Sequence, residues 1–393
     1  MMPQKIKEDI FFIGIRDWDR RLFDELIPLP DGTSYNAYLV KGSEKIALID
    51  TVDPTKKEAL INQLKTLNLS ELDFVISQHA EQDHSGVLPE VLNLYPKAKL
   101  VTNKKCQSLL MDLLLIPKDR FLIIEDGQRL SLGNKTLRFI FTPWVHWPET
   151  LCTYLEENKI LFSCDFFGSH YATSKLFANE KEVYFPAKRY YAEIMMPFRK
   201  NIKRNLEKIE GFEIEMIAPS HGPIYFHPQF ILDAYKQWVS DEVKNEVIIP
   251  YVSMHGSTEK MVNFFIDCLI QRGIGVKPFM LSKTDIGELA MAMVDAATIV
   301  LAAPMVLAGP HPLAIHTAYL ANALRPKAKF ASFIGSYAWG GKLLETIKGI
   351  LSNFKGEFLE PILARGYPKK ADFENLERLA DEVLSKHKEI GII

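Results

Sequence analysis

Four side chains that can bind a metal lie within the six-residue segment His79-Ala80-Glu81-Gln82-Asp83-His84. The segment follows an apolar stretch, Phe74-Val75-Ile76-Ser77, which has the composition of a buried strand. Imidazole nitrogens and carboxylate oxygens together suit a transition metal of intermediate hardness. The segment therefore predicts a metal site, and the alternative is a solvated polar loop with two ordinary histidines.

The spacing of these residues bears on how they would share a site. In an extended strand end, residues two apart point the same way, so His79, Glu81 and Asp83 are expected to face one cavity. A turn at Ser85-Gly86 would then bring His84 to the other side of a metal pair.

Three later segments repeat one pattern, an apolar strand followed by one possible ligand. His146 lies within Thr142-Pro143-Trp144-Val145-His146-Trp147-Pro148, Asp165 ends Lys159-Ile160-Leu161-Phe162-Ser163-Cys164-Asp165, and His221 follows Met216-Ile217-Ala218-Pro219-Ser220. Rigid scaffolds present functional side chains from strand ends in this way. A lone histidine in such a place is more often structural, but four segments in this order favour a metal centre.

With these segments, the chain resembles the metallo-β-lactamase superfamily, which carries H-x-H-x-D-H, a distant His, a bridging Asp and a last His. This chain has Glu81 where the hydrolases have a second histidine. A carboxylate adds negative charge and hardens the site, which favours iron over zinc. H-x-E-x-D-H followed by a flavodoxin-like half is similar to the flavodiiron proteins, also called A-type flavoproteins.

The resemblance implies a set of ligands for two irons. It assigns His79, Glu81 and His146 to one iron, Asp83, His84 and His221 to the other, and Asp165 to the bridge between them. His170 lies near Asp165 in sequence, and we expect either a donor to bound substrate or a surface histidine.

Composition narrows the class of protein. The chain has 393 residues, 47% of them hydrophobic and 24% charged, which is enough for two or three domains with substantial cores. A net charge of −2 does not indicate a nucleic-acid partner. No run has the length of a membrane span, and the first residues do not resemble a signal peptide. The chain has four cysteines and no C-x-x-C pair, which indicates free thiols in a reducing cytoplasm: Cys106, Cys152, Cys164 and Cys268.

Residues 1–245 are expected to form an αββα sandwich. Two apolar runs flanking Lys41-Gly42-Ser43-Glu44 predict a β-hairpin. Asp53 is a plausible cap for a helix that runs through Leu67. Residues 187–209 have the pattern of one long helix, in which Tyr190 and Tyr191 are expected to be packed aromatics rather than site residues.

Residues 246–393 show strict alternation of strands and helices. Such alternation predicts a parallel, doubly wound sheet, and Asp241-Glu242-Val243-Lys244-Asn245 reads as the linker before it. The predicted fold is therefore α/β: a metallo-β-lactamase-like sandwich followed by a flavodoxin-like sheet.

A hydroxyl-rich loop follows the first strand of this second half and opens its first helix. Backbone N–H groups at a helix start, with Ser and Thr hydroxyls, form an anion cradle. No lysine follows the loop, so a nucleoside triphosphate is not expected. The loop resembles the phosphate loop of flavodoxins, which implies flavin mononucleotide (FMN) bound by Ser253, Met254, His255, Gly256, Ser257 and Thr258.

Two further loops fall where the flavodoxins contact the flavin ring, after the third and fourth strands. Glycines there allow close backbone approach to a flat ring, and Tyr337 or Trp339 is expected to stack on it. The alternative is that these are ordinary β-α turns. The expected contacts are Pro304, Met305, Val306, Leu307, Ala308 and Gly309 in one loop, and Ser336, Tyr337, Ala338, Trp339 and Gly340 in the other.

The resemblance implies an enzyme that passes electrons from FMN to a non-haem di-iron centre and reduces O2 to water, NO to N2O, or both. One alternative is a metallo-β-lactamase-type hydrolase with a passenger flavodoxin domain, and another is an electron carrier with an inert sandwich. The resemblance also implies an external electron donor, a rubredoxin-like protein or a reduced deazaflavin coenzyme. It implies a head-to-tail homodimer or a dimer of dimers.

Overall fold

The computed structural model describes residues 2–393. The chain divides into two compact units, one of residues up to Tyr191 with Phe198–Val239, the other of Ala192–Pro197 with Ser240–Ile393. Among the described residues, no helix combines the length and the apolar character needed to cross a membrane.

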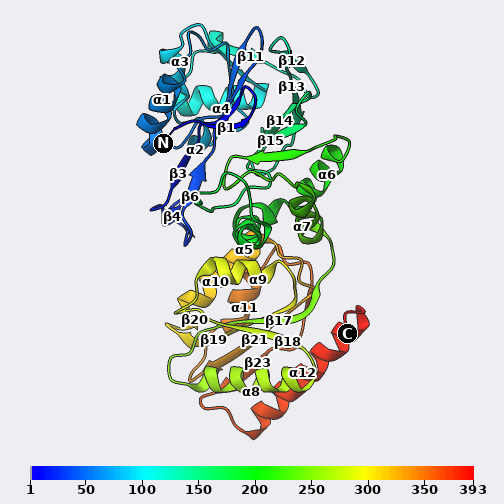
Figure 1. The fold of residues 1–393 in the computed structure, drawn as a ribbon. Coiled ribbons are helices and arrows are strands. Elements are labelled where there is room, and N and C mark those ends of the chain that lie inside the picture. Colours follow the sequence, from blue (N-terminus) through cyan, green and yellow to red (C-terminus); the bar gives the residue numbers. More distant parts are fainter. Residues whose placement is uncertain (1) are drawn as a thin grey trace. The chain divides into compact units, whose positions relative to one another are not determined.

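The first unit is built on two β-sheets (Figure 1). The first sheet has the order β1 (Gln4–Lys7), β2 (Ile10–Phe12), β7 (Tyr38–Lys41), β8 (Ile46–Ile49), β9 (Phe74–Ile76), β10 (Lys99–Thr102), β11 (Phe121–Ile123). Strands β7 and β8 form the hairpin expected around residues 41–44, and β8, β9 and β10 run parallel. Two small hairpin-like pairs lie outside these sheets, β3 (Ile15–Asp17) with β6 (Thr33–Tyr35) and β4 (Leu22–Phe23) with β5 (Ile27–Pro28).

The second sheet of this unit is a five-stranded sheet packed against the first. Its order is β12 (Arg129–Ser131), β13 (Thr136–Phe141), β14 (Leu151–Leu155), β15 (Ile160–Cys164), β16 (Met216–Pro219). Tyr38 and Val40 of the first sheet share one apolar core with Phe139 and Phe162 of the second. This core is the layer between the sheets.

Helices cover the outer faces of the two sheets. Leu39 and Leu48, which alternate with the inner-facing residues, pack with Leu60 of α1 in a separate outer core. On the second sheet, Lys208 of α6 donates to the Phe141 carbonyl at 2.9 Å. The helices of this unit are α1 (Lys57–Thr66), α2 (Gln82–Ser85), α3 (Leu88–Leu94), α4 (Lys104–Leu114), α5 (Glu180–Tyr190), α6 (Arg199–Ile209) and α7 (Gln229–Val239). The layers therefore run helix, sheet, sheet, helix, as predicted.

The boundaries of α5 and α6 differ from the sequence prediction. The helix expected over 187–209 begins earlier, at Glu180, where Asn179 caps it by accepting from the Lys181 N–H. It is also interrupted, because a π-helical turn over Tyr191–Met195 and a 3-10 turn over Met196–Phe198 separate α5 from α6. Pro197 lies at the break, and its missing N–H and its ring do not fit a continuous helix.

The second unit has one parallel sheet, in the order β18 (Gly275–Met280), β17 (Lys244–Tyr251), β19 (Ala296–Val306), β21 (Phe330–Tyr337), with β22 (Glu357–Phe358) and β23 (Ile362–Arg365) both beside β21. The first strand along the chain thus lies between the second and the third. This order is the flavodoxin-like one, and it creates a switch point at the carboxyl ends of β17 and β19.

Helices cover both faces of this sheet (Figure 1). Phe265 of α8 and Leu379 of α12 belong to one core, whereas Ala318 of α10 and Ile347 of α11 belong to another. The helices are α8 (Ser257–Gln271), α9 (Ile286–Met293), α10 (Pro312–Leu324), α11 (Leu343–Ile350) and α12 (Lys370–Glu389).

Candidate metal centre and phosphate-loop pocket

The H-x-E-x-D-H segment does not continue its strand as expected. Strand β9 ends at Ile76, and a four-residue helix, α2, begins directly after Glu81. Alternation of side chains along a strand therefore does not arrange these ligands, and Asp83 and His84 are neighbours on α2. The turn is fixed because the Ser85 hydroxyl donates to the Ala80 carbonyl at 2.7 Å.

The other three candidate residues follow strands, as predicted. His146 lies in the loop after β13, Asp165 comes directly after β15, and His221 lies two residues beyond β16. Strands β13 to β16 are neighbours in one sheet, so these residues approach α2 from the second sheet.

The structure brings all seven side chains into two adjoining groups. One group contains His79, Glu81, His146 and Asp165, and the other contains Asp83, His84 and His221. In the first group, the Nε2 atoms of His79 and His146 each lie 3.1 Å from Glu81 Oε2.

Asp165 joins the two groups through its two oxygens. Its Oδ2 lies 3.5 Å from Nε2 of His79 and also 3.5 Å from Nε2 of His146. Its Oδ1 lies 3.0 Å from Nε2 of His84 and 3.3 Å from Nε2 of His221. One carboxylate thus presents one oxygen to each group.

The donor set fits a pair of metal ions. Asp83 and Asp165 are 5% and 1% exposed, yet none of their carboxylate oxygens makes a hydrogen bond. A buried carboxylate without a hydrogen bond is costly unless a cation compensates it. Two cations, one in each group, would satisfy these oxygens together with the inward-facing imidazole nitrogens.

The histidines and carboxylates of the cluster shift one another's pKa values. Burial alone would lower the pKa of His146 and His221, but Asp165 with Glu81 or Asp83 raises these pKa values to about 9 and about 10. Burial would raise the pKa of Asp165, but His84, His146 and His221 hold it well below its usual range. The carboxylates therefore stay ionised next to protonated histidines, and bound metal ions would replace the protons on these histidines.

His170, predicted as a possible substrate donor, is buried beside the second group rather than on the surface. Its ring centroid lies 4.9 Å from that of His221 and 4.8 Å from that of Tyr190. Nδ1 lies 2.9 Å from the Thr33 hydroxyl, and Nε2 is buried without a hydrogen bond. Burial, then the charge of His221, holds the pKa of His170 well below its usual value, which keeps this imidazole neutral.

Sequence reasoning missed Glu149, which contacts His79 directly. Its Oε1 lies 2.7 Å from His79 Nδ1, the nitrogen that faces away from the cluster. The signal was its position, three residues after His146 in an otherwise polar-poor loop.

The four cysteines are free and buried, as the sequence indicated. Cys164 belongs to a further group with His84 and Asp165. Burial, followed by the charge of Asp165, raises the pKa of the Cys164 thiol well above its usual value, so it is protonated.

The hydroxyl-rich loop forms one wall of a cavity of about 250 Å³ at the switch point of the second unit. Gly256 caps α8 with a φ of 84°, and Ser257 and Thr258 of the first turn line the cavity. The Thr258 hydroxyl lies 2.9 Å from that of Ser336, which joins two of the predicted segments. The cavity is lined by Ser253, Met254, His255, Ser257, Thr258, Pro304, Met305, Ser336, Tyr337, Ala338, Gly366 and Tyr367.

Several predicted flavin contacts do not line this cavity: Gly256, Val306, Leu307, Ala308, Gly309, Trp339 and Gly340. The predicted loop after the third strand is instead part of β19, which continues to Val306 and folds back on β20 (Gly309–Pro310). Leu307 and Trp339 are 89% and 63% exposed. Similarly, Ser336 and Tyr337 belong to β21 rather than to the loop after it.

Gly366 and Tyr367 line the cavity and were not predicted. They follow β23, the last strand of the sheet, so they come from the same edge as the predicted loops. The signal was the Gly-Tyr pair directly after an apolar strand. The Lys260 ammonium lies over the Tyr367 ring, 5.2 Å from its centroid.

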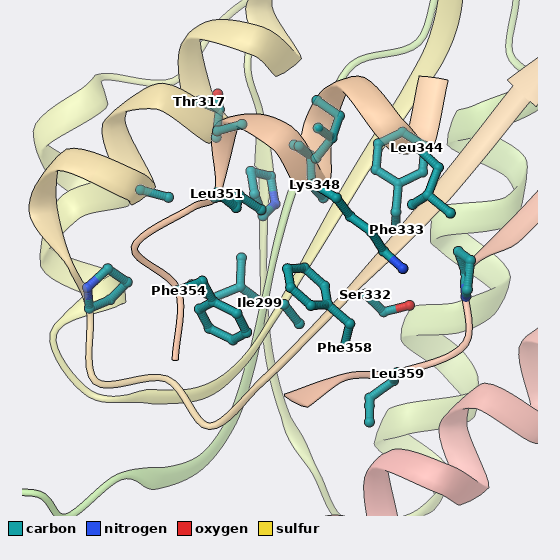
Figure 2. Close-up of a pocket in the computed structure, with 18 of the residues that line it drawn as sticks. Ile299, Thr317, Ser332, Phe333, Leu344, Lys348, Leu351, Phe354, Phe358 and Leu359 are labelled. Carbon is teal, nitrogen blue, oxygen red and sulfur yellow. The ribbon is translucent and has the colours of Figure 1, made fainter. Parts of the chain in front are cut away.

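A second hollow of this unit has a different character. Figure 2 shows Phe333, Leu344, Phe354 and Phe358 around it, with Ser332 and Lys348 as polar members. It holds about 50 Å³ and contains none of the residues predicted to bind flavin. The Ser332 hydroxyl already donates to the Glu360 carbonyl at 3.0 Å. This hollow is not the cofactor pocket.

Known proteins resemble the chain over most of its length. The family model described as "ODP family beta lactamase" matches residues 33–222. A nitric oxide reductase of Moorella thermoacetica is 34% identical over 354 residues, covering 87% of this chain and 88% of that protein. A coenzyme F420H(2) oxidase of Methanothermobacter marburgensis is 33% identical over 321 residues and 79% of each chain.

Solved structures agree with the sequence relatives. The rubredoxin oxygen:oxidoreductase of Desulfovibrio gigas superposes with a TM-score of 0.94 at 27% identity, over 98% of both chains. The flavodiiron protein of Giardia intestinalis superposes with a TM-score of 0.87 at 26% identity, also over 98% of both chains. The chain belongs to the flavodiiron proteins.

Membership in the flavodiiron family confirms the predicted fold of both halves and makes the chain an oxidoreductase. The hydrolase alternative is not favoured. The family implies a flavin and a di-iron centre, and the two sites described above have the donors and the position that such groups require.

Proposed function

We propose that this flavodiiron protein reduces dioxygen to water, nitric oxide to nitrous oxide, or both, in a reducing cytoplasm. The proposal rests on the position of the Asp165 carboxylate, which presents one oxygen to each of two groups of buried side chains. A site for one metal would not need two such groups. Three relatives support this choice of reaction by their names: a nitric oxide reductase, a coenzyme F420H(2) oxidase and a rubredoxin oxygen:oxidoreductase.

Iron is the metal that the donor set favours. Glu81 stands in the first group with two histidines, so its carboxylate replaces a nitrogen donor and hardens the site. Glu81, Asp83 and Asp165 carry three negative charges against four positive charges on two ferrous ions. The remaining positive charge suits a site that also holds an anionic bridge or substrate.

FMN is the flavin that the second unit fits best. The cavity is lined by the first turn of α8 and by the hydroxyl side chains of Ser253, Ser257 and Thr258. Such a cradle suits one phosphate group. Tyr337 and Tyr367, which also line the cavity, supply aromatic surface for the flavin ring.

When bound, two ferrous ions and a reduced flavin together hold four electrons, which is the number that reduction of dioxygen to two waters consumes. The residues of the chain prepare the site for that chemistry. Asp83, His84 and His221, which are all buried, would hold the second metal where water has little access. The neutral His170 presents an imidazole nitrogen without a partner beside that position, where it can donate to or accept from a bound substrate.

The electron donor is proposed to be a separate molecule, a rubredoxin-like protein or a reduced deazaflavin coenzyme. The rubredoxin oxygen:oxidoreductase and the coenzyme F420H(2) oxidase to which the chain is similar support these two choices. We also propose a head-to-tail dimer, or a dimer of dimers, as the working assembly.

Protein expressed with ample iron and purified anaerobically, without added flavin, tests the proposal. We expect about two irons and one FMN per chain, and turnover of O2 or NO when either donor is supplied. Zinc as the sole metal after expression with ample iron would contradict the iron assignment. Release of a flavin dinucleotide on acid treatment would contradict the FMN assignment.

A further inference from the structure

Glu149 is a fully buried carboxylate that serves two segments of the metal centre at once. It is 2% exposed. Its Oε1 accepts the N–H of Ala80 at 3.1 Å and lies 2.7 Å from His79 Nδ1. With an ionised carboxylate as acceptor, the His79 proton lies on Nδ1, which leaves the lone pair on Nε2. That nitrogen is the one near Glu81 and Asp165.

The backbone of Glu149 is fixed as firmly as its side chain. Asn103, which caps α4, donates from Nδ2 to the Glu149 carbonyl at 2.5 Å. The neighbouring Thr150 closes the loop that carries His146, because its hydroxyl donates to the Thr142 carbonyl at 2.6 Å. Glu149 therefore links the segment of His79 to the loop of His146, and both histidines belong to the same metal position.

In the described part of the chain, the histidines of the second metal position have no carboxylate behind them. The Nδ1 atom of His221 lies 2.7 Å from the backbone carbonyl of Ser34. Within residues 2–393, Nδ1 of His84 is buried and makes no hydrogen bond. A side-chain carboxylate behind a ligating histidine thus occurs at His79, and neither His84 nor His221 has one. Carboxylates in this place fix ring orientation and raise the basicity of the metal-binding nitrogen.

We propose that Glu149 is a positioning residue for His79 and that it selectively sets the metal affinity of the position formed by His79, Glu81 and His146. The inference rests on the proposed di-iron function and goes beyond it. It assigns unequal support to the two metal positions and names the side chain responsible.

Ferrous-ion binding to the full-length metal-free protein tests this, measured anaerobically by competition with a chromophoric chelator. Wild-type protein should show two binding events. Glu149→Ala should weaken one of them about 10–100-fold and leave the other nearly unchanged. Glu149→Gln keeps an oxygen acceptor for both N–H groups and loses only the charge, so it should weaken the same event by less. A purely structural role would affect both events equally.

Glu90→Gln is the matched control, since Glu90 is a half-exposed carboxylate paired with Lys57. It should leave both binding events unchanged. Equal weakening of both events in the Glu149 variants, or a shift of the same size in Glu90→Gln, would overturn the inference. If Glu149→Ala does not fold, unchanged affinities in Glu149→Gln overturn it. A wild-type protein that binds fewer than two ferrous ions contradicts the proposed function instead.

Discussion

Asp165 and Glu81 decide what the buried cluster can bind. Asp165 joins the two ligand groups, and Glu81 lies 3.1 Å from both histidines of the first group. Because Glu81 contacts only that group, its removal should empty one metal position before the other. Glu81→Ala is therefore expected to lower the iron content from about two per chain toward one, by elemental analysis of anaerobically loaded protein. Loss of both irons, or of neither, would contradict the assignment of Glu81 to one position.

The raised pKa values of the cluster histidines predict how stability depends on pH in chelator-treated protein. A histidine whose pKa rises on folding contributes stability that is full below its unfolded pKa, about 6.5, and is lost as pH rises through the folded pKa. For His146 and His221 the folded values are about 9 and about 10. The thermal unfolding midpoint of the metal-free protein should therefore decrease as the pH is raised from about 6.5 to about 10.

Iron-loaded protein is the control for this titration, because bound metal replaces the protons on these histidines. Its thermal midpoint should depend much less on pH over the same range. A metal-free protein whose midpoint is constant or rises from pH 6.5 to 10 would show that these histidines are not charged within the folded cluster.

Thr258 is the residue that most directly tests the phosphate cradle. It is 1% exposed, and its hydroxyl lies at the N-terminal turn of α8 beside Ser336. Thr258→Ala should weaken FMN binding by about 1.5–3 kcal/mol, the range for a hydrogen bond to a charged group. Fluorescence titration of the flavin-free protein measures this. Riboflavin, which lacks the phosphate, should bind wild type and variant alike.

At the scale of elements, the strands were predictable and the connections between them were not. Apolar runs such as Phe74–Ser77 identify buried strands, because a strand covered on both faces must be apolar throughout. The four-residue helix α2 left no such pattern, since it is shorter than two turns and is fixed by the Ser85–Ala80 hydrogen bond. For the same reason, its ligands were placed on an extended segment.

Loop predictions failed where strands extend beyond their apolar core. Strand β19 continues to Val306 because its end pairs with β20, and strand β21 continues to Tyr337 beside β23. Such pairings join residues that single-sequence patterns treat as turns. The candidate metal ligands were less affected, because the family resemblance assigned them by their place in a motif and not by the boundary of an element.

The turn after β16 offers a test of how elements position the second metal site. Gly222 has a φ of 80°, and a Cβ there would overlap the side chain of Ser169. Gly222→Ala should cost about 1–3 kcal/mol of unfolding free energy in urea denaturation and should lower metal binding next to His221. Gly273→Ala is the matched control, since Gly273 has a φ of 69° with open space around it. An equal cost in both variants would assign the effect to backbone conformation alone.

At the scale of the whole molecule, the proposed head-to-tail dimer makes a prediction about pairs of defective chains. An Asp165→Ala chain should lose iron and keep flavin, and a chain altered at Ser253 and Thr258 should lose flavin and keep iron. Neither homodimer should turn over. If electrons cross between chains, a mixed dimer keeps one complete flavin–iron pair and should regain reductase activity. Verified mixed dimers without activity would reject the crossed arrangement.

Anomalous X-ray scattering from crystals of the iron-loaded protein would locate the two irons that we propose on either side of the Asp165 carboxylate. Data collected on both sides of the iron absorption edge should show two iron peaks, one within the group of His79, Glu81 and His146 and one within the group of Asp83, His84 and His221. Each should lie beside a different oxygen of Asp165. A single iron peak, a signal only at the zinc edge, or a peak away from Asp165 would rule out a di-iron centre joined by this carboxylate.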